Sequence, residues 1–458
     1  MNHKDFGKAF ELPLGQDEFW RAMRQGLGRA ILHVREHGVK DRDGGDLTEM
    51  ILTGCLYSFV LNPLFDWRRA KWMLMMAEEA GIVDVVAERL LAEERVGDVW
   101  TCNDWHEEHR REIAKELYDY AMKRGDVELG ERLKKWLYDN FRQHEAFYHF
   151  FGWEELFEVD GEKGLLFVCE RLGQWFMENE DRREDGSVLE MYDEMYGKGE
   201  AKHVLDSASG ESEGVRVFLE RLVIEDEEED VSEKKERRKH WWERLSGQEM
   251  VEAIRSKRNA PEALKRGYRF WGMRADEEDL KVVADAMYEE VDEGFLKDFM
   301  WVFDLRALPR VEQKAIDWMG HEDREVRQLA YEMMGNVKDE RVRAWGMRKL
   351  KAGEDLADGA YRLFKVNMKA GDEKLLREAA RVFGDPDDLH GEMLDIVNLV
   401  HEQKDAELVD LIMFIYEWSP CGECKKGMVE KMRELECLPR WVDDELTWDV
   451  SAIEDKKL

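Results

Sequence analysis

Two cysteines three positions apart, Cys421 and Cys424, have the spacing most suggestive of chemistry in this sequence. They stand in the stretch EWSPCGECKK, directly after Ser419 and Pro420. Serine is a favoured helix N-cap and proline fits the first helical position, so we expect both thiols in the first turn of a helix, facing the same way. The amide groups of a helix start lower a thiol pKa. A redox pair, half of a metal site and a structural helix start are the three interpretations.

The redox interpretation depends on a local similarity to a thioredoxin active site. An apolar stretch, DLIMFIYEW, precedes the two cysteines, and an amphipathic helix is expected after them. A thioredoxin fold needs several more strands and a helix after this motif, whereas only 34 residues follow Cys424. The sequence therefore disfavours a thioredoxin domain.

The metal interpretation needs further ligands. Cys437 could supply a third thiolate, and His390 or His401 a distant fourth ligand for zinc. No second cysteine pair at finger-like spacing occurs, so the ligand set is incomplete. We favour reduced, structural cysteines at Cys421, Cys424 and Cys437, and keep zinc and thiol-redox chemistry as alternatives.

Two histidine pairs come close to metalloprotease spacing. His106 and His109 lie three apart but miss both the HExxH and the HxxEH pattern by one residue, and HEAFYH, from His144 to His149, is one residue too long. Cys102 with His106 and His109 could hold a metal. A solvated helix start is the favoured interpretation of that charged stretch.

Other chemical signatures are missing from the sequence. We find no GxxxxGK[ST], no GxGxxG after a strand, no GxSxG and no EF-hand loop. We therefore expect no catalytic residues and no cofactor.

The formal charge of -34 over 458 residues limits the possible partners. A field of this sign repels phosphate backbones, so nucleic-acid binding is not expected. Acidity fits solubility, a basic protein partner or mimicry of nucleic acid. Six irregularly spaced cysteines, no secretory signal and no uncharged apolar run long enough to span a bilayer predict a cytoplasmic protein that does not enter membranes.

The fold class follows from the apolar pattern. With only 7 prolines and long stretches rich in Glu, Lys, Arg, Leu, Ala and Met, the chain is predicted to be all-α. We expect an N-terminal helical domain over 1–177, a charged loop or linker over 178–240, and stacked helical hairpins over 241–458. In the last region helix starts recur so that a helix pair repeats on the order of every thirty-odd residues.

One motif occurs twice in the repeat region. Asp323 stands three residues before Val326 and Arg327, and Asp339 stands three residues before a second Val-Arg pair. Each aspartate is expected at a helix start, where free N–H groups and the dipole favour it, and each valine begins the buried stripe.

This pattern resembles the HEAT-like repeat, Asp-x-x-Val-Arg-x-x-Ala-x-x-x-Leu-Gly, over Asp323 to Gly335, with Met334 in the leucine place. The second copy has Gly346 where alanine is expected. The resemblance implies a curved α-solenoid whose concave face binds a partner. We therefore expect a non-catalytic scaffold or adaptor that binds a protein; a zinc or thiol-redox protein and an acidic nucleic-acid mimic are the alternatives.

Metal content distinguishes structural cysteines at Cys421 and Cys424 from a metal site. If the cysteines are structural, purified protein should contain no stoichiometric zinc, and the double variant Cys421→Ser/Cys424→Ser should leave its metal content unchanged. Atomic absorption together with thiol counting measures both. One zinc per chain that disappears in the variant would show that the motif is a metal site.

Overall fold

The computed structural model describes residues 10–58, 69–92, 103–143, 150–179, 186–222, 245–257, 261–356, 358–380, 396, 399–400, 408–419 and 421–455. Within these ranges the chain is all-α apart from a two-residue antiparallel pair, β1 (Arg142–Gln143) with β2 (Phe150–Phe151), and one isolated bridge. None of the described helices is long and apolar enough to cross a membrane.

The chain forms two compact units. The N-terminal unit comprises Phe10–Glu228 together with Asp444–Leu458, and the C-terminal unit is built on Glu229–Asp443. The last residues of the chain therefore belong with its beginning, which differs from the boundaries expected from the sequence.

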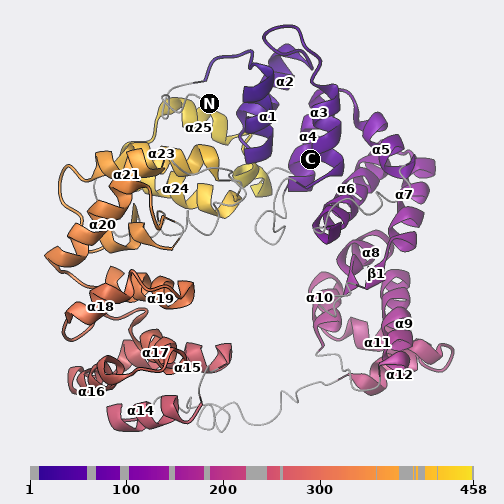
Figure 1. Cartoon of the computed structure of the whole chain (residues 1–458). Coiled ribbons are helices and arrows are strands. Elements are labelled where there is room, and N and C mark those ends of the chain that lie inside the picture. Colours follow the sequence, from indigo (N-terminus) through magenta and orange to yellow (C-terminus); the bar gives the residue numbers. More distant parts are fainter. Residues whose placement is uncertain are drawn as a thin grey trace. The chain divides into compact units, whose positions relative to one another are not determined.

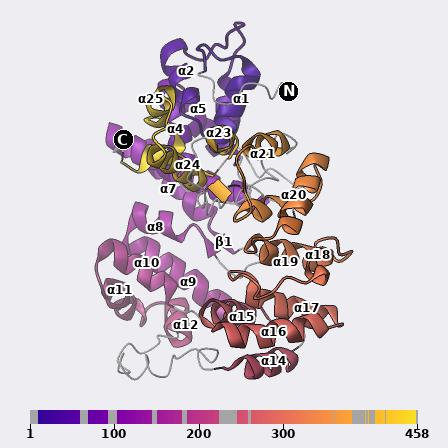
Figure 2. The same cartoon turned by 90° about the vertical axis from the view of Figure 1, so that its left-hand side faces the viewer.

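The N-terminal unit begins with short helices that alternate between two layers. Its helices are α1 (Gln16–Gln25), α2 (Arg29–His37), α3 (Thr48–Leu56), α4 (Arg69–Glu79), α5 (Val83–Ala92), α6 (Asn103–Arg124), α7 (Val127–Asp139), α8 (Trp153–Asp160), α9 (Glu162–Glu178), α10 (Ser187–Tyr196), α11 (Glu200–Ala208) and α12 (Glu213–Arg221). Along one layer α2 packs on α4, α4 on α6, α6 on α8 and α8 on α10; along the other, α1 packs on α3, α3 on α5 and α5 on α7 (Figures 1 and 2).

Three of these helices correct a prediction. Residues 187–221, expected to be part of a charged loop or linker, form α10, α11 and α12. Their buried side chains include Leu189, Leu205 and Phe218. The small polar residues that suggested a loop lie at the turns, where glycines such as Gly197 and Gly199 adopt positive φ. Residues 223–244 lie outside the described ranges.

The C-terminal unit contains the region expected to repeat. Its elements are α14 (Gly247–Arg255), α15 (Glu262–Arg274), α16 (Glu277–Glu289), α17 (Glu293–Met300), η3 (Trp301–Phe303), α18 (Gln313–Trp318), α19 (Arg324–Gly335), α20 (Glu340–Ala352), η4 (Ala360–Phe364), α21 (Glu373–Ala380), α23 (Val409–Trp418) and α24 (Gly422–Glu434). A further helix, α25 (Arg440–Leu446), extends into the closing segment, which we define as Asp444–Leu458 and which contains η7 (Val450–Asp455).

Successive second helices of this unit pack on one another. The helix α15 contacts α17 and η3, α17 contacts α19, and α19 contacts η4. Figure 1 shows α15, α17 and α19 on one side of the unit and α16, α18 and α20 on the other. The pairs α18 with α19 and α20 with η4 connect the two sides.

The helix starts follow the sequence pattern. Asp323 is the N-cap of α19 and accepts a hydrogen bond from the Val326 amide, and Asp339 is the N-cap of α20 and accepts one from the Arg341 amide. Val326 and Val342 are both fully buried. The predicted role of the two aspartates and the two valines is confirmed.

Two asparagines repeat the same contact between neighbouring hairpins. Asn336, which ends α19, donates from Nδ2 to the Asp304 carbonyl, 32 residues earlier and 2.7 Å away. Asn367, just after η4, donates from Nδ2 to the Val337 carbonyl, 30 residues earlier and also 2.7 Å away. Each amide thus ties the end of one second helix to the end of the preceding one.

The arginines of the Val-Arg pairs also repeat their contacts. Arg327 pairs with Asp358, 31 residues later, and Arg343 pairs with Asp372, 29 residues later. Each contact therefore spans about one helix pair, although Arg327 lies on a second helix, α19, and Arg343 on a first helix, α20.

The closing segment is held to the N-terminal unit by a buried ion pair. Glu445 accepts from the Nε of Arg29 at 2.7 Å and from its Nη2 at 2.9 Å, and also from the Arg29 amide at 3.0 Å. Nearby, the Val450 amide donates to the Gly26 carbonyl, and Trp72 donates to the Trp448 carbonyl. These contacts join parts of the chain that are separated by about four hundred residues.

The glycine at the start of α2 allows this close approach. A Cβ on Gly28 would lie 2.1 Å from the Glu445 carbonyl oxygen and 2.8 Å from the backbone at Trp448. Such distances leave no room for a side chain, so position 28 requires glycine for the closing segment to dock.

Removing one partner of the buried pair should destabilise the N-terminal unit strongly. We expect Glu445→Ala to lower its free energy of unfolding by about 3 to 5 kcal/mol, because it removes the buried carboxylate that accepts three hydrogen bonds from Arg29. Arg89→Ala, which removes an exposed pair with Glu49, is the control and should cost under about 1 kcal/mol. Chemical denaturation measures both, and equal losses would contradict the role given to Glu445.

Candidate functional site

The two cysteines of the sequence motif lie together at a helix start, but with a different capping residue. Cys421, not Ser419, is the N-cap of α24, and its sulfur accepts a 3.5 Å hydrogen bond from the Cys424 amide. The Ser419 hydroxyl accepts from the Cys421 amide at 3.2 Å. Pro420 lies outside the described residues.

A reactive thiol pair is partly exposed and lies in surroundings that favour the thiolate, whereas the two thiols here meet neither condition. Both side chains are buried. The hydrogen bond with Cys421, followed by burial, raises the pKa of the Cys424 thiol well above its ordinary value. The expectation of a lowered thiol pKa at this helix start is therefore wrong, because the neighbouring sulfur and the apolar surroundings outweigh the helix amides.

A zinc site built on these cysteines is not assembled. Cys437 follows the far end of α24, so a rise of about 1.5 Å per residue places it about 20 Å from the helix start. His390 and His401 lie outside the described residues. Within the described part of the chain, no three or more His, Cys, Asp and Glu side chains gather where they could hold a metal ion.

The histidines of α6 have structural contacts. His106 accepts from the Ser58 amide through Nδ1, and His109 donates from Nε2 to the Gly54 carbonyl, each at 3.0 Å. Burial lowers the pKa of His109 to about 4. The expected solvated helix start is thus wrong for His109, which joins α6 to the end of α3. Cys102, His144 and His149 lie outside the described residues.

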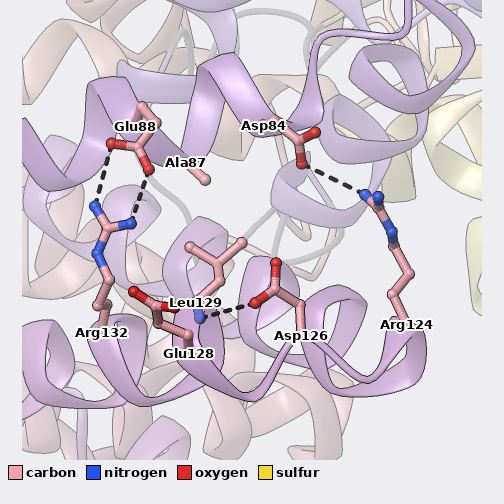
Figure 3. Close-up of a pocket in the computed structure, with 8 residues that line it drawn as sticks. All are labelled: Asp84, Ala87, Glu88, Arg124, Asp126, Glu128, Leu129 and Arg132. Atoms are coloured by element: carbon pink, nitrogen blue, oxygen red, sulfur yellow. Dashed lines mark hydrogen bonds and ion pairs between the residues drawn. The ribbon is translucent and has the colours of Figure 1, made fainter.

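A pocket of about 320 Å³ lies where α5 meets the corner between α6 and α7 (Figure 3). Arg132 holds Glu88 through two hydrogen bonds of 2.8 and 3.1 Å, and Arg124 pairs with Asp84 at 3.4 Å. Asp126 caps α7 by accepting from the Leu129 amide. Both guanidinium groups of the pocket already pair with its carboxylates, so the arrangement is that of surface ion pairs.

A different group of side chains connects four elements of the C-terminal unit. We call it the second-helix strip; its members are Lys265, Arg269, Trp301, Asp304, Glu332 and Arg362. The Arg269 guanidinium lies over the Trp301 ring, 4.9 Å from its centroid, and the Lys265 ammonium lies 5.8 Å from the same centroid. Arg269 forms an ion pair with Asp304, and Arg362 forms one with Glu332.

The two carboxylates of the strip are neighbours between two cations. Burial, and then the charge of Glu332, raise the pKa of Asp304 to about 7, while Arg269 and Arg362 act in the opposite direction. Near neutral pH the Asp304 side chain therefore carries its proton for part of the time.

Large apolar side chains border the strip and are open to solvent. Phe270 and Met273 on α15 are 45% and 46% exposed, Leu305 beside Asp304 is 46% exposed, and Val366 beside η4 is 37% exposed. Exposed basic residues accompany them, among them Arg266 and Arg306. Apolar groups within a charged surface are typical of protein-binding sites.

The strip was not identified from the sequence, although a signal exists. The segment KRGYRFWGMR of α15 contains four basic residues and no acidic one, and YRLFKVNMK of η4 and the residues after it contains three and none. Both stand out in a chain with a net charge of -34. The contacts across Trp301 and Asp304 that unite these segments depend on the packing of the helices.

Comparisons with known proteins assign no family. No protein-family profile matches the sequence, and no curated protein matches it. One crystal structure of an engineered protein from the Northeast Structural Genomics Consortium aligns with 96% of this chain and 94% of its own, at 13% identity and a TM-score of 0.17. A likeness at that score carries no argument about fold or function.

Titration of Asp304 should make stability depend on pH. Its pKa is raised in the folded protein, so the folded state holds the proton more tightly than the unfolded chain, and the stability from this group is lost as the pH rises from about 4 to about 7. Relative to the wild type, Asp304→Asn should gain on the order of 1 kcal/mol in unfolding free energy between about pH 5 and about pH 8. Denaturant titrations at both pH values measure this.

The matched control is Glu322→Gln, which removes an exposed carboxylate of the same unit. Its effect on stability should not change between the two pH values. A difference between Asp304→Asn and the wild type that stays constant with pH would contradict the raised pKa of Asp304.

Proposed function

We propose that this chain is a non-catalytic scaffold or adaptor whose C-terminal unit binds a protein partner through the second-helix strip. The hairpins of that unit are proposed to stack as a HEAT-like α-solenoid, with the second helices forming the binding face. The single observation that carries the proposal is the band of exposed apolar and basic side chains across α15, η3 and η4.

The stacking proposal is supported by contacts that repeat along the unit. Asn336 and Asn367 bond to the preceding second helix over 32 and 30 residues, and Arg327 and Arg343 pair with aspartates 31 and 29 residues later. Repeats of that length are typical of helical arrays. Each hairpin buries its apolar face against neighbours, so the solvent-facing side of the second helices is available for binding.

The scaffold function is favoured over the two alternatives, a zinc or thiol-redox protein and an acidic nucleic-acid mimic. A redox or metal function at Cys421 and Cys424 needs thiolates, whereas the hydrogen bond with Cys421 and burial raise the pKa of the Cys424 thiol and favour its protonated form. Mimicry of nucleic acid depends on an acidic surface, whereas the strip is basic. A cytoplasmic location stays a prediction; the five cysteines among the described residues are all free thiols, as a reducing compartment would maintain.

Affinity capture from the native host tests the scaffold function. The wild-type chain should retain one or more proteins that Phe270→Ser/Leu305→Ser retains several-fold less well, because these two side chains supply apolar contact area at the binding face. Quantitative mass spectrometry of the captured proteins measures the ratio. Titration of each purified candidate partner into the purified chain then shows whether the two proteins bind each other directly.

The control is Val282→Ser/Val291→Ser, which removes exposed apolar side chains away from the strip. It should retain the same proteins as the wild type. If no protein depends on Phe270 and Leu305 more than on Val282 and Val291, the proposed binding face is wrong.

A further inference from the structure

The second-helix strip has a charge opposite to that of the chain as a whole. Its core holds three cations, Lys265, Arg269 and Arg362, against the carboxyls of Asp304 and Glu332, and Lys265 also pairs with the exposed Glu325 at 3.6 Å. Arg266 and Arg306 add two exposed cations at its border. The net charge of the strip is therefore positive, within a chain of net charge -34.

The geometry of the arginines favours carboxylates. The ion pair of Arg269 with Asp304 runs through Nε, while the flat guanidinium lies over the Trp301 ring. An arginine that is stacked and anchored in this way loses little entropy on binding and can hold a further carboxylate with its terminal nitrogens. The existing contacts with Asp304 and Glu332 already show which chemical group these cations accept.

Trp301 adds a donor that needs a partner. Its Nε1 is buried and has no hydrogen-bond acceptor among the described residues. An unsatisfied buried N–H is costly, so a ligand that opened the strip enough to place a carboxylate oxygen on this nitrogen would recover that cost. The two members of the strip that stack on Trp301, Lys265 and Arg269, would bring such a group close.

The apolar side chains determine the rest of the ligand. Phe270 and Met273 lie about one turn apart on α15, and Leu305 and Val366 follow on the next second elements. A ligand that was only a polyanion would leave this area exposed. A peptide with large apolar side chains between its acidic residues would bury it.

From these observations, and resting on the proposed scaffold function, we propose that the partner segment recognised by the second-helix strip is an acidic peptide containing at least one large apolar side chain. The overall negative charge of the chain would have suggested a basic partner. The local field at the strip decides the contact instead, because exposed charges farther apart than about 8 to 10 Å are largely screened at physiological salt.

Selection from a display library of random 16-residue peptides tests the partner chemistry. Peptides that bind the full-length wild-type chain, and lose at least about tenfold in affinity for Arg266→Glu/Arg306→Glu, should be net negative and contain Phe, Trp, Leu, Ile or Met. Their affinity should fall with added salt, and should rise as the pH drops from about 8 to about 6 and Asp304 gains its proton between Arg269, Glu332 and Arg362. Fluorescence anisotropy with synthetic peptides measures these values.

The control variant is Lys338→Glu/Lys351→Glu, which changes the net charge by the same amount at exposed positions outside the strip. It should bind the selected peptides as the wild type does. Strip-dependent peptides that are neutral or basic, equal losses in both variants, or a library that yields no strip-dependent binder would each overturn the proposal. Strip-dependent binding of a random single-stranded RNA in place of peptides would do the same.

The two experiments fail independently. A native partner that is captured through Phe270 and Leu305, but whose contact segment is basic, would leave the scaffold function in place and remove the acidic-peptide inference. Peptide binding at the strip without any captured host protein would remove the scaffold function alone.

Discussion

Most of the described helices have one apolar face that only neighbouring helices can cover, whereas α4 and α23 are buried on nearly all sides. The stripe of α19, with Val326, Ala330 and Met333 fully buried, is covered from α17, α18 and η4. Because a hairpin cannot cover its own outer sides, one pair needs the next. This constraint produces the two layers in each unit and leaves one face of the second helices in contact with solvent.

Polar contacts then determine how one hairpin is placed against the next. Apolar packing is not directional, whereas the amides of Asn336 and Asn367 bond to particular carbonyls of the preceding second helix. The arginines of the two Val-Arg motifs do the same with aspartates of the following hairpin. A register fixed in this way brings Arg269, Asp304, Glu332 and Arg362 next to one another, although each belongs to a different hairpin.

The distribution of burial separates residues with structural roles from those available for binding. The side chains that looked reactive, Cys421, Cys424 and His109, are buried and hydrogen-bonded to backbone or to each other. The solvent-exposed side chains Phe270 and Leu305 belong to no recognisable sequence motif. The proposed binding surface is therefore of mixed apolar and basic character, and Asp304 changes its charge near neutral pH.

The sequence alone determined the features that depend on a few neighbouring residues. The all-α class follows from helical stripes, and Asp323 and Asp339 could be placed at helix starts because a cap bonds to an amide two or three residues away. The same local reasoning failed for Cys424, whose pKa depends on the burial of α24 as well as on its helix turn. It failed also for residues 187–221, where turn residues concealed three short helices.

Only the tertiary structure decided which distant residues meet. The Arg29 and Glu445 side chains form their ion pair across 416 positions, and the second-helix strip extends from Lys265 to Arg362. An apolar stripe shows that one face of a helix is buried, but it does not show which helix covers that face. Many different partner helices could bury the same apolar area. The shape of each side chain and the direction of its hydrogen bonds select one arrangement, and these act only once the helices are packed.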